Sequence, residues 1–167
     1  MSRNELFDTE TMDLASRVLE AARSKGIRLG CAESCTGGLI ASALTAIPGS
    51  SDCFVGGVVS YWMSVKENLL GVNPEVIETF GVVSAQTACA MASGVVDALG
   101  CDVAVSTTGI AGPGGEEPGK PVGTVCIGIS TPQGTHVITT CKGSSREEVR
   151  LLAVRAALTL LLEALEA

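Results

Sequence analysis

Short apolar runs alternate along this chain with segments of helical periodicity, and this alternation constrains the fold more than any other feature. Residues 11–24 carry apolar side chains at the spacing of one helix face, and the apolar run at 27–32 is typical of a buried strand. The predicted strands are residues 27–32, 54–61, 103–108, 124–130 and 136–141. The predicted helices are residues 11–24, 37–46, 64–70, a short one from 73, 85–99 and 145–165.

Strands that are joined by helices pair in parallel, whereas the two strands around Pro132-Gln133-Gly134 are expected to form a hairpin. We therefore expect an α/β fold in which a mixed, mostly parallel sheet carries helices on both faces. The 167 residues suit one domain, covering residues 1–167. In such sheets, ligands bind at the carboxyl ends of the parallel strands.

Capping residues predict where several helices begin. The first helix is expected to start near Asp8 or Thr9. Two segments have the pattern of a capping box, in which a Ser and a Glu three residues later bond each other's backbone. Ser64-x-x-Glu67 predicts the start of a short helix, and Ser145-x-x-Glu148 the start of the last one.

The charge of the chain argues against a nucleic-acid partner. The net charge is −7, and the 11 Lys and Arg residues form no run. No apolar stretch reaches 18 residues without a charge, and residues 1–5 lack the apolar segment of a signal peptide. We expect a cytoplasmic protein with no membrane segment.

The seven cysteines include no C-x-x-C pair, so we expect no zinc site and no disulfide scaffold. Most lie inside apolar runs, where a free cysteine behaves as a small hydrophobic residue. This usage fits a reducing compartment.

Ser34 is the first candidate for chemistry. It lies in Glu33-Ser34-Cys35-Thr36-Gly37-Gly38, where a predicted strand ends and a helix begins. A serine at such a junction is a candidate nucleophile, and the backbone N–H groups that follow it are a candidate oxyanion hole. Two other interpretations stay open: an ordinary N-cap serine, and a phosphate-binding loop that lacks the G-K-[ST] ending.

Lys66 is the candidate base for such a nucleophile. It lies among small and apolar residues just past the second predicted strand, and burial there would lower its pKa. The only histidine, His136, falls in the predicted hairpin, where a structural role is expected, so a Ser–Lys pair is favoured over a histidine triad. The alternatives are a solvated Lys66 that pairs with Glu67 or Glu33, and a thiol enzyme that uses Cys35.

Two further segments offer groups to a polar ligand. Residues 106–115 bring hydroxyls and bare glycine backbone to the end of the third strand, followed by a long Gly/Pro-rich loop. Arg146 stands at the start of the last helix, with Arg150 one turn further on the same face, a placement that suits a phosphate. An exposed loop and an exposed, capped helix are the plainer interpretations.

Five segments in order resemble the CinA C-terminal family of nicotinamide-nucleotide amidohydrolases. They cover roughly residues 12–165, and five ordered motifs are more specific than any one alone. The segments are Ala32-Glu33-Ser34-Cys35-Thr36-Gly37-Gly38, Val59-Ser60-Tyr61 with Lys66 five residues later, Gly81-Val82-Val83-Ser84, Thr108-Gly109-Ile110-Ala111-Gly112-Pro113 and Pro121-Val122-Gly123-Thr124-Val125.

The resemblance implies a three-layer α/β/α sandwich in the form without the family's additional N-terminal domain. It also implies hydrolysis of nicotinamide mononucleotide to nicotinate mononucleotide and ammonia in pyridine nucleotide salvage, with no metal or cofactor. By the same resemblance Ser34 is the nucleophile, Lys66 its base and Tyr61 an assisting residue. The expected substrate contacts are backbone at Thr36, Gly37 and Gly38, which would bind the oxyanion, then Thr108, Gly109 and Gly112 lining the pocket, and Arg146 near the 5′-phosphate.

The chain departs from the family pattern at two places near the expected substrate. Trp62-Met63-Ser64-Val65 stands where the family usually has Ser-Asn-Glu-Ala, and Ser144-Ser145-Arg146 where it usually has Gly-Asp-Arg. The alternative function is therefore a non-catalytic nucleotide-binding or scaffold protein of the same fold. The last helix is apolar on more than one face, so we also expect a homo-oligomer.

Overall fold

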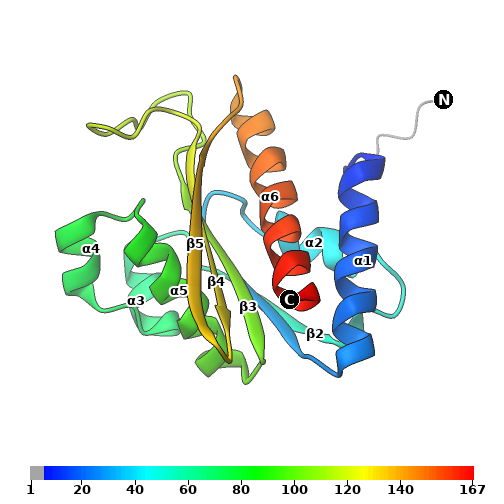
Figure 1. Cartoon of the computed structure of the whole chain (residues 1–167). Coiled ribbons are helices and arrows are strands. Elements are labelled where there is room, and N and C mark those ends of the chain that lie inside the picture. The colour runs from blue at the N-terminus through cyan, green and yellow to red at the C-terminus, as the bar shows by residue number, and fades with distance from the viewer. Residues whose placement is uncertain (1–5) are drawn as a thin grey trace.

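The computed structural model describes residues 6–167 as a five-stranded sheet with helices packed on both sides (Figure 1). Residues 1–5, on which the signal-peptide expectation depends, lie outside the described residues. The strands are β1 (Leu29–Glu33), β2 (Phe54–Val59), β3 (Val103–Gly109), β4 (Thr124–Thr131) and β5 (Gly134–Cys141). The helices are α1 (Thr9–Lys25), α2 (Leu39–Thr45), α3 (Met63–Leu70), α4 (Pro74–Phe80), α5 (Ala85–Leu99) and α6 (Arg146–Glu166), and a 3-10 helix, η1, spans Ser50–Asp52.

The strand order in the sheet is β2-β1-β3-β4-β5. β1 pairs in parallel with β2 and β3, and β4 runs antiparallel to β3 and β5. The sheet is therefore mixed, and β4 alone of its five strands runs against the rest, which confirms the predicted fold class. The carboxyl ends of β1, β2 and β3 share one edge of the sheet.

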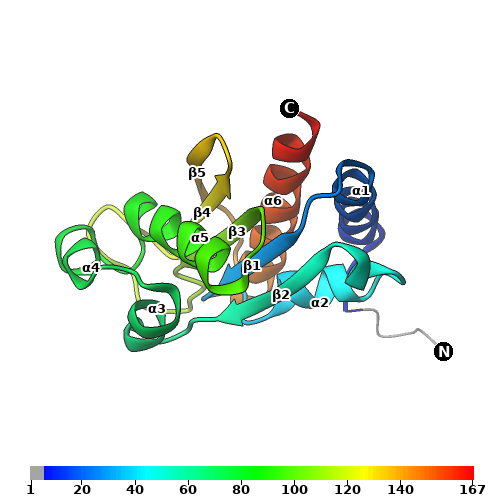
Figure 2. The same ribbon diagram turned by 90° about the horizontal axis from the view of Figure 1, so that it is seen from below.

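The sheet is the middle of three layers (Figure 2). α1, α2 and α6 cover one face, and α3, α4 and α5 cover the other. A large apolar core fills the first face, with Leu19, Leu158 and Leu161 almost fully buried. A smaller apolar cluster around Met91 and Val95 fills the second.

The predicted helix starts are confirmed at Asp8 and in part at Ser145. Asp8 Oδ1 accepts a hydrogen bond of 2.8 Å from Thr11 N, so Asp8 is the N-cap of α1. Ser145 Oγ accepts from Glu148 N at 3.2 Å. The Glu148 carboxylate accepts from the N–H and the hydroxyl of Ser144 instead of from Ser145 N, so only half of the capping box forms.

The capping box predicted at Ser64 and Glu67 is wrong. α3 begins at Met63 with Trp62 as its N-cap, and no side chain caps it. The Trp62 carbonyl accepts from Lys66 N at 3.2 Å, so Ser64 already lies inside the first turn. Lys66 lies three residues after Met63 and is fully buried.

Candidate active site

Ser34 directly follows β1, at the carboxyl edge of the sheet. Its N–H donates to the Thr107 carbonyl at 3.0 Å, so the pairing with β3 continues to Ser34. The chain then turns sharply, with Gly37 at φ 60° and Gly38 at φ 99°, before α2 begins at Leu39. Only glycine adopts such angles at little cost, which explains the two glycines after the serine.

Lys66 reaches Ser34 from the neighbouring α3. Its side chain is fully buried, and Nζ lies 3.1 Å from Ser34 Oγ. Nζ also donates to the carbonyl of Ser60 at 2.6 Å and to that of Tyr61 at 3.4 Å. The structure therefore joins the two residues that the sequence paired, and the expectation of a solvated Lys66 beside Glu67 or Glu33 is wrong.

Burial lowers the pKa of Lys66 to about 8, because the charged ammonium loses its hydration and no carboxylate replaces it. A neutral amine carries two protons and one lone pair. When the two carbonyls take those protons, the lone pair is left facing the Ser34 hydroxyl. This arrangement suits removal of a proton from Ser34.

Glu33, next to the nucleophile candidate, is a buried carboxylate whose partners are all backbone N–H groups or a thiol. Oε2 accepts from Gly38 N at 3.0 Å and from Ile40 N at 3.1 Å, and Oε1 accepts from Ala41 N at 2.8 Å. These bonds and the dipole of α2 replace the lost hydration of the carboxylate. Glu33 therefore fixes the start of α2 relative to β1.

The bonds around Glu33 correct part of the oxyanion-hole expectation. Gly38 N is occupied by Glu33, and Gly37 N donates to the Ser34 carbonyl at 3.1 Å. Within residues 6–167, the N–H groups of Cys35 and Thr36 have no acceptor. Of the expected oxyanion-hole donors Thr36, Gly37 and Gly38, only the Thr36 N–H is available. The Cys35 N–H is a second available donor that was not expected.

Arg150 holds the turn that carries these donors. Its Nε donates to the Cys35 carbonyl at 3.1 Å and its Nη2 to the Thr36 carbonyl at 3.2 Å. The Cys35 carbonyl and the Thr36 N–H belong to the same trans peptide, in which the C=O and the N–H point in opposite directions. Because the carbonyl faces Arg150, the Thr36 N–H points away from Arg150.

A second contact ties this turn to β3. The hydroxyls of Thr36 and Thr107 lie 2.8 Å apart, and both side chains are fully buried. The Thr36 hydroxyl is therefore a structural group, and only its backbone is available to a ligand.

Arg146, Tyr61 and Gly112 meet at the rim of the site, although they come from three distant segments. Arg146 Nη1 donates to the Gly112 carbonyl at 2.8 Å, and Nη2 donates to the Tyr61 hydroxyl at 3.1 Å. Tyr61 is about half exposed, at 55%, and its own carbonyl faces Lys66. The structure brings these three predicted residues together.

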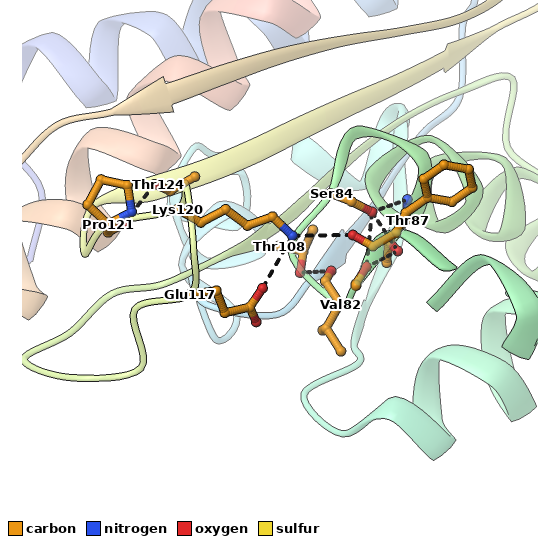
Figure 3. A network of polar contacts seen from close by, with 10 residues as sticks. Val82, Ser84, Thr87, Thr108, Glu117, Lys120, Pro121 and Thr124 are labelled. Atoms are coloured by element: carbon orange, nitrogen blue, oxygen red, sulfur yellow. Dashed lines mark hydrogen bonds and ion pairs between the residues drawn. The ribbon is translucent and has the colours of Figure 1, made fainter. Parts of the chain in front are cut away.

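Thr108 and Gly109 have structural contacts that the sequence did not predict. Thr108 is fully buried, and its hydroxyl donates to the Val82 carbonyl at 2.8 Å (Figure 3). A side chain on Gly109 would lie 2.7 Å from Val125 Cγ2, so the glycine allows β3 and β4 to pack closely. Neither residue presents a free side-chain group to a pocket.

Lys120 anchors the long loop between β3 and β4 to the end of α4. Its Nζ donates to the Phe80 carbonyl and to Glu117, both at 3.2 Å (Figure 3). Residues 116–118 are exposed, as the interpretation of this segment as an exposed loop predicts.

Cys35 and His136 do not take the alternative catalytic roles. Burial raises the pKa of the Cys35 thiol to about 11, so the thiol is protonated at neutral pH and the Cys35 alternative is disfavoured. His136 lies exposed on β5 opposite Ile129, and β3 and β4 separate that strand from β1. A triad with Ser34 is therefore excluded by the topology.

Two of the surface hollows bear on where the site lies. One of about 400 Å³ lies beside the site, lined by Leu6, Leu39, Arg146, Glu147, Arg150 and Leu151. A larger one, about 600 Å³, lies at the amino ends of β1 and β3 and includes His136. We place the chemistry beside the smaller hollow, because only that end of the sheet joins a hydroxyl to a buried amine.

Three contributors were missed as functional candidates from sequence: Glu33, Ser60 and Thr107. Arg150 was named, but for a phosphate and not for the turn after Ser34. Glu33 carried a signal, since a charged residue at the end of a buried apolar strand needs a specific partner. In residues 6–167 no helix is long and apolar enough to cross a membrane, and no cluster of three metal-ligating side chains occurs.

The fold and the site define a class: a three-layer α/β protein with a buried serine–lysine pair at the carboxyl edge of its sheet. Residues 11–165 match the family described as the CinA C-terminal domain. The chain belongs to this family.

Relatives and solved structures agree with this assignment. The chain is 48% identical to a CinA-like protein of Desulfotalea psychrophila over 155 residues, covering 93% of this chain and 37% of that protein. It is 46% identical to a CinA-like protein of Myxococcus xanthus over 165 residues, covering 96% of this chain and 38% of that protein. The chain thus spans little more than a third of the length of these relatives.

Among solved structures, the competence/damage inducible protein CihA from Agrobacterium tumefaciens superimposes with a TM-score of 0.90 at 42% identity, and both chains are covered completely. A CinA superfamily protein from Klebsiella pneumoniae gives the same TM-score at 35% identity, covering 93% of this chain and 98% of its own.

Proposed function

We propose that this chain is a Ser–Lys amidohydrolase that converts nicotinamide mononucleotide to nicotinate mononucleotide and ammonia. The observation that carries the proposal is the 3.1 Å distance between Ser34 Oγ and a fully buried Lys66 Nζ. A hydroxyl next to an amine of lowered pKa is the minimal machinery for nucleophilic attack on an amide. The choice of nicotinamide mononucleotide rests on the family resemblance.

In the first step, neutral Lys66 takes the Ser34 proton, and Oγ attacks the carboxamide carbon. The carbonyl oxygen becomes an oxyanion, which the available N–H groups of Cys35 and Thr36 would bind. Such donors typically contribute 10²–10³ in rate per group.

In the second step, the C–N bond breaks, the nitrogen takes a proton and leaves as ammonia, and an ester remains on Ser34. In the third step, Lys66 takes a proton from water, and the resulting hydroxide attacks the ester carbon. When the tetrahedral intermediate collapses, Lys66 returns the proton to Ser34 Oγ and the nicotinate product is released. Lys66 begins and ends the cycle neutral.

The substrate contacts follow from the rim of the site. Arg146 and Arg150 line the adjacent hollow, and Arg146 offers positive charge to a 5′-phosphate. Tyr61, Gly112 and the backbone near Gly109 border the same edge. The partner is then a small-molecule nucleotide, and we extend the proposal to a cytoplasmic homo-oligomer that binds no nucleic acid.

Ammonia release from nicotinamide mononucleotide tests the proposal, with the wild type and Ser34→Ala measured side by side. We expect release by the wild type and a loss of at least about 10³-fold in the variant, with unchanged thermal unfolding.

Calorimetry of nicotinamide mononucleotide covers the alternative. The exposed Trp62 and Met63, 72% and 53% accessible, place bulky apolar groups next to the site, and this departure favours nucleotide binding without catalysis. If the wild type binds the nucleotide tightly without turnover, the result would support the alternative hypothesis of a non-catalytic nucleotide-binding or scaffold protein.

A further inference from the structure

Ser34 is almost inaccessible to a ligand in this structure. It is 8% exposed, and Lys66 is fully buried. For attack on an amide, the substrate carbon has to come within about 3–3.5 Å of the Ser34 Oγ. The hollow beside the site is lined by Arg146 but not by Ser34 or Lys66. A substrate that enters this hollow therefore reaches Ser34 only after the rim of the site has rearranged.

Arg146 links the two segments that flank Ser34. In the sheet, β1 lies between β2 and β3. Ser34 directly follows β1, whereas Tyr61 follows the end of β2 and Gly112 follows the end of β3. Arg146 donates to the Tyr61 hydroxyl at 3.1 Å and to the Gly112 carbonyl at 2.8 Å. These two bonds therefore hold together the segments on either side of the nucleophile.

A ligand can replace both bonds. Arg146 and Tyr61 are exposed, so their bond already competes with water. Both acceptors of Arg146 are neutral, whereas a phosphate is charged and matches the guanidinium fork with two parallel bonds. Arg146 also lines the hollow, so a phosphate that enters there can take over its N–H groups.

The loop that carries Gly112 can follow such a change. Residues 113–119 are exposed, and the far end of the loop is held by Lys120, which donates to the Phe80 carbonyl (Figure 3). Exposed segments with few buried contacts move at low cost. When Arg146 lets go of Gly112, this end of the loop can move away from Ser34 while the far end stays in place.

We propose that Arg146 is a latch that keeps Ser34 covered until an anionic group of the substrate releases it, which makes Arg146 a specificity-determining residue. In the free protein, its bonds to Tyr61 and Gly112 close the rim. A phosphate takes over the N–H groups of Arg146, the two segments separate, and the carboxamide reaches the Ser34 Oγ. A ligand shifts such an equilibrium by its preference for one state, and here the phosphate binds the open state. The inference takes the anion to be the 5′-phosphate of the substrate, and in this respect it rests on the proposed function.

The first test follows Tyr61 by 19F NMR. Tyr61 is the only tyrosine of the chain, so protein made with 3-fluorotyrosine gives a single signal. We expect ribose 5-phosphate to move this signal towards its position in Arg146→Met, because both changes remove the bond to the Tyr61 hydroxyl. Ribose, the control without phosphate, should leave the signal in place. The inference is overturned if ribose 5-phosphate does not move the signal, or moves it equally in Arg146→Met.

The second test measures access to Ser34 by its rate of labelling with a small fluorophosphonate. We expect Arg146→Met to be labelled at least about fivefold faster than the wild type, and inorganic phosphate to speed labelling of the wild type but not of the variant. Loss of a nearby positive charge would by itself slow the attack, so a faster rate reports the uncovering of Ser34. Arg17→Met, at an exposed arginine of α1, is the matched control and should behave as the wild type. Labelling of Arg146→Met at or below the wild-type rate overturns the latch.

Both tests use no nicotinamide nucleotide, so they separate the latch from the proposed function. If the wild type releases no ammonia from nicotinamide mononucleotide but its labelling and its 19F signal respond to phosphate as expected, the proposed function fails and the latch stands. If ammonia is released while Arg146→Met is labelled no faster than the wild type, the latch fails and the proposed function stands. If Ser34 is labelled in no variant, the 19F signal alone decides whether phosphate releases Arg146 from Tyr61.

Discussion

The two faces of the sheet are built differently. The face under α1, α2 and α6 buries Leu, Val, Ile and Ala side chains in one large core. The face under α3, α4 and α5 has smaller apolar clusters and buries the hydroxyls of Ser34, Ser60, Ser106 and Thr108 together with Lys66. The first face stabilises the fold, and the second gives up apolar contacts for polar groups.

The two buried ionisable groups beside Ser34, Glu33 and Lys66, sharpen this contrast. Glu33 receives three backbone N–H bonds, so its burial is compensated by a helix start. Lys66 donates only to neutral oxygen atoms, so its buried charge is poorly compensated and its pKa is lowered. A poorly compensated buried charge lowers stability, and such groups cluster at functional sites. The contrast predicts where a substitution lowers activity and where it lowers stability.

Lys66→Met is expected to give the largest effect. Loss of the base should lower kcat/KM by about 10³–10⁴-fold. The same change should raise the free energy of unfolding at pH 7 by about 1–3 kcal/mol, because burial no longer opposes a charge. Ammonia release and denaturant unfolding measure the two effects.

The stability gain in Lys66→Met should depend on pH. The pKa of Lys66 is about 8 in the folded protein, against an ordinary value of 10.5. Between these values the unfolded chain binds more protons, so the stability of the wild type rises with pH relative to the variant. The difference between the two should shrink from pH 8 to about 10.5. If Lys66→Met is less stable than the wild type at pH 7, the claim that the buried charge of Lys66 lowers stability is contradicted.

Leu161→Ala tests the other face. Leu161 is fully buried in the large core, and truncation there should cost about 3 kcal/mol and lower the melting temperature by roughly 10 °C. Activity per folded molecule should stay within about twofold. Leu69→Ala, at a position 58% exposed, is the matched control and should change stability by less than about 0.5 kcal/mol.

The pH profile of the wild type should follow Lys66. Only the neutral amine can take the Ser34 proton, so kcat/KM should rise with pH and level off above a pKa of about 8. A base of this pKa gives roughly a tenfold rise between pH 7 and 9. A flat profile over this range would mean that Lys66 is not the base.

Arg150→Ala should give the smallest effect among the substitutions near Ser34. It removes the two hydrogen bonds that hold the Cys35 and Thr36 carbonyls, and should lower kcat about tenfold with little change in KM. Arg150→Lys is the control, since one ammonium replaces the two-pronged guanidinium, and an intermediate loss is expected. An equal rise in KM with unchanged kcat would assign Arg150 to substrate binding instead.

Much of this architecture could be predicted from the sequence, because it depends on periodicity and order. Ser34 and Lys66 are 32 residues apart but follow neighbouring parallel strands, so their meeting could be foreseen. The occupied N–H groups of Gly37 and Gly38 could not, because local sequence does not show that Gly37 N bonds the Ser34 carbonyl or that the Glu33 side chain bonds Gly38 N and the start of α2. The start of α3 at Met63 was also hidden, because Trp62 caps it through backbone alone.

A fluorophosphonate probe tests most directly the claim that Ser34 is a nucleophile activated by Lys66, because it forms a stable bond with an activated serine. Labelling would be followed by intact mass and the labelled residue found by peptide mapping. We predict one label on Ser34 in the wild type, none in Ser34→Ala, and labelling at least about 10²-fold slower in Lys66→Met. A label on Cys35 or elsewhere, or equal labelling rates in the wild type and Lys66→Met, would contradict the account.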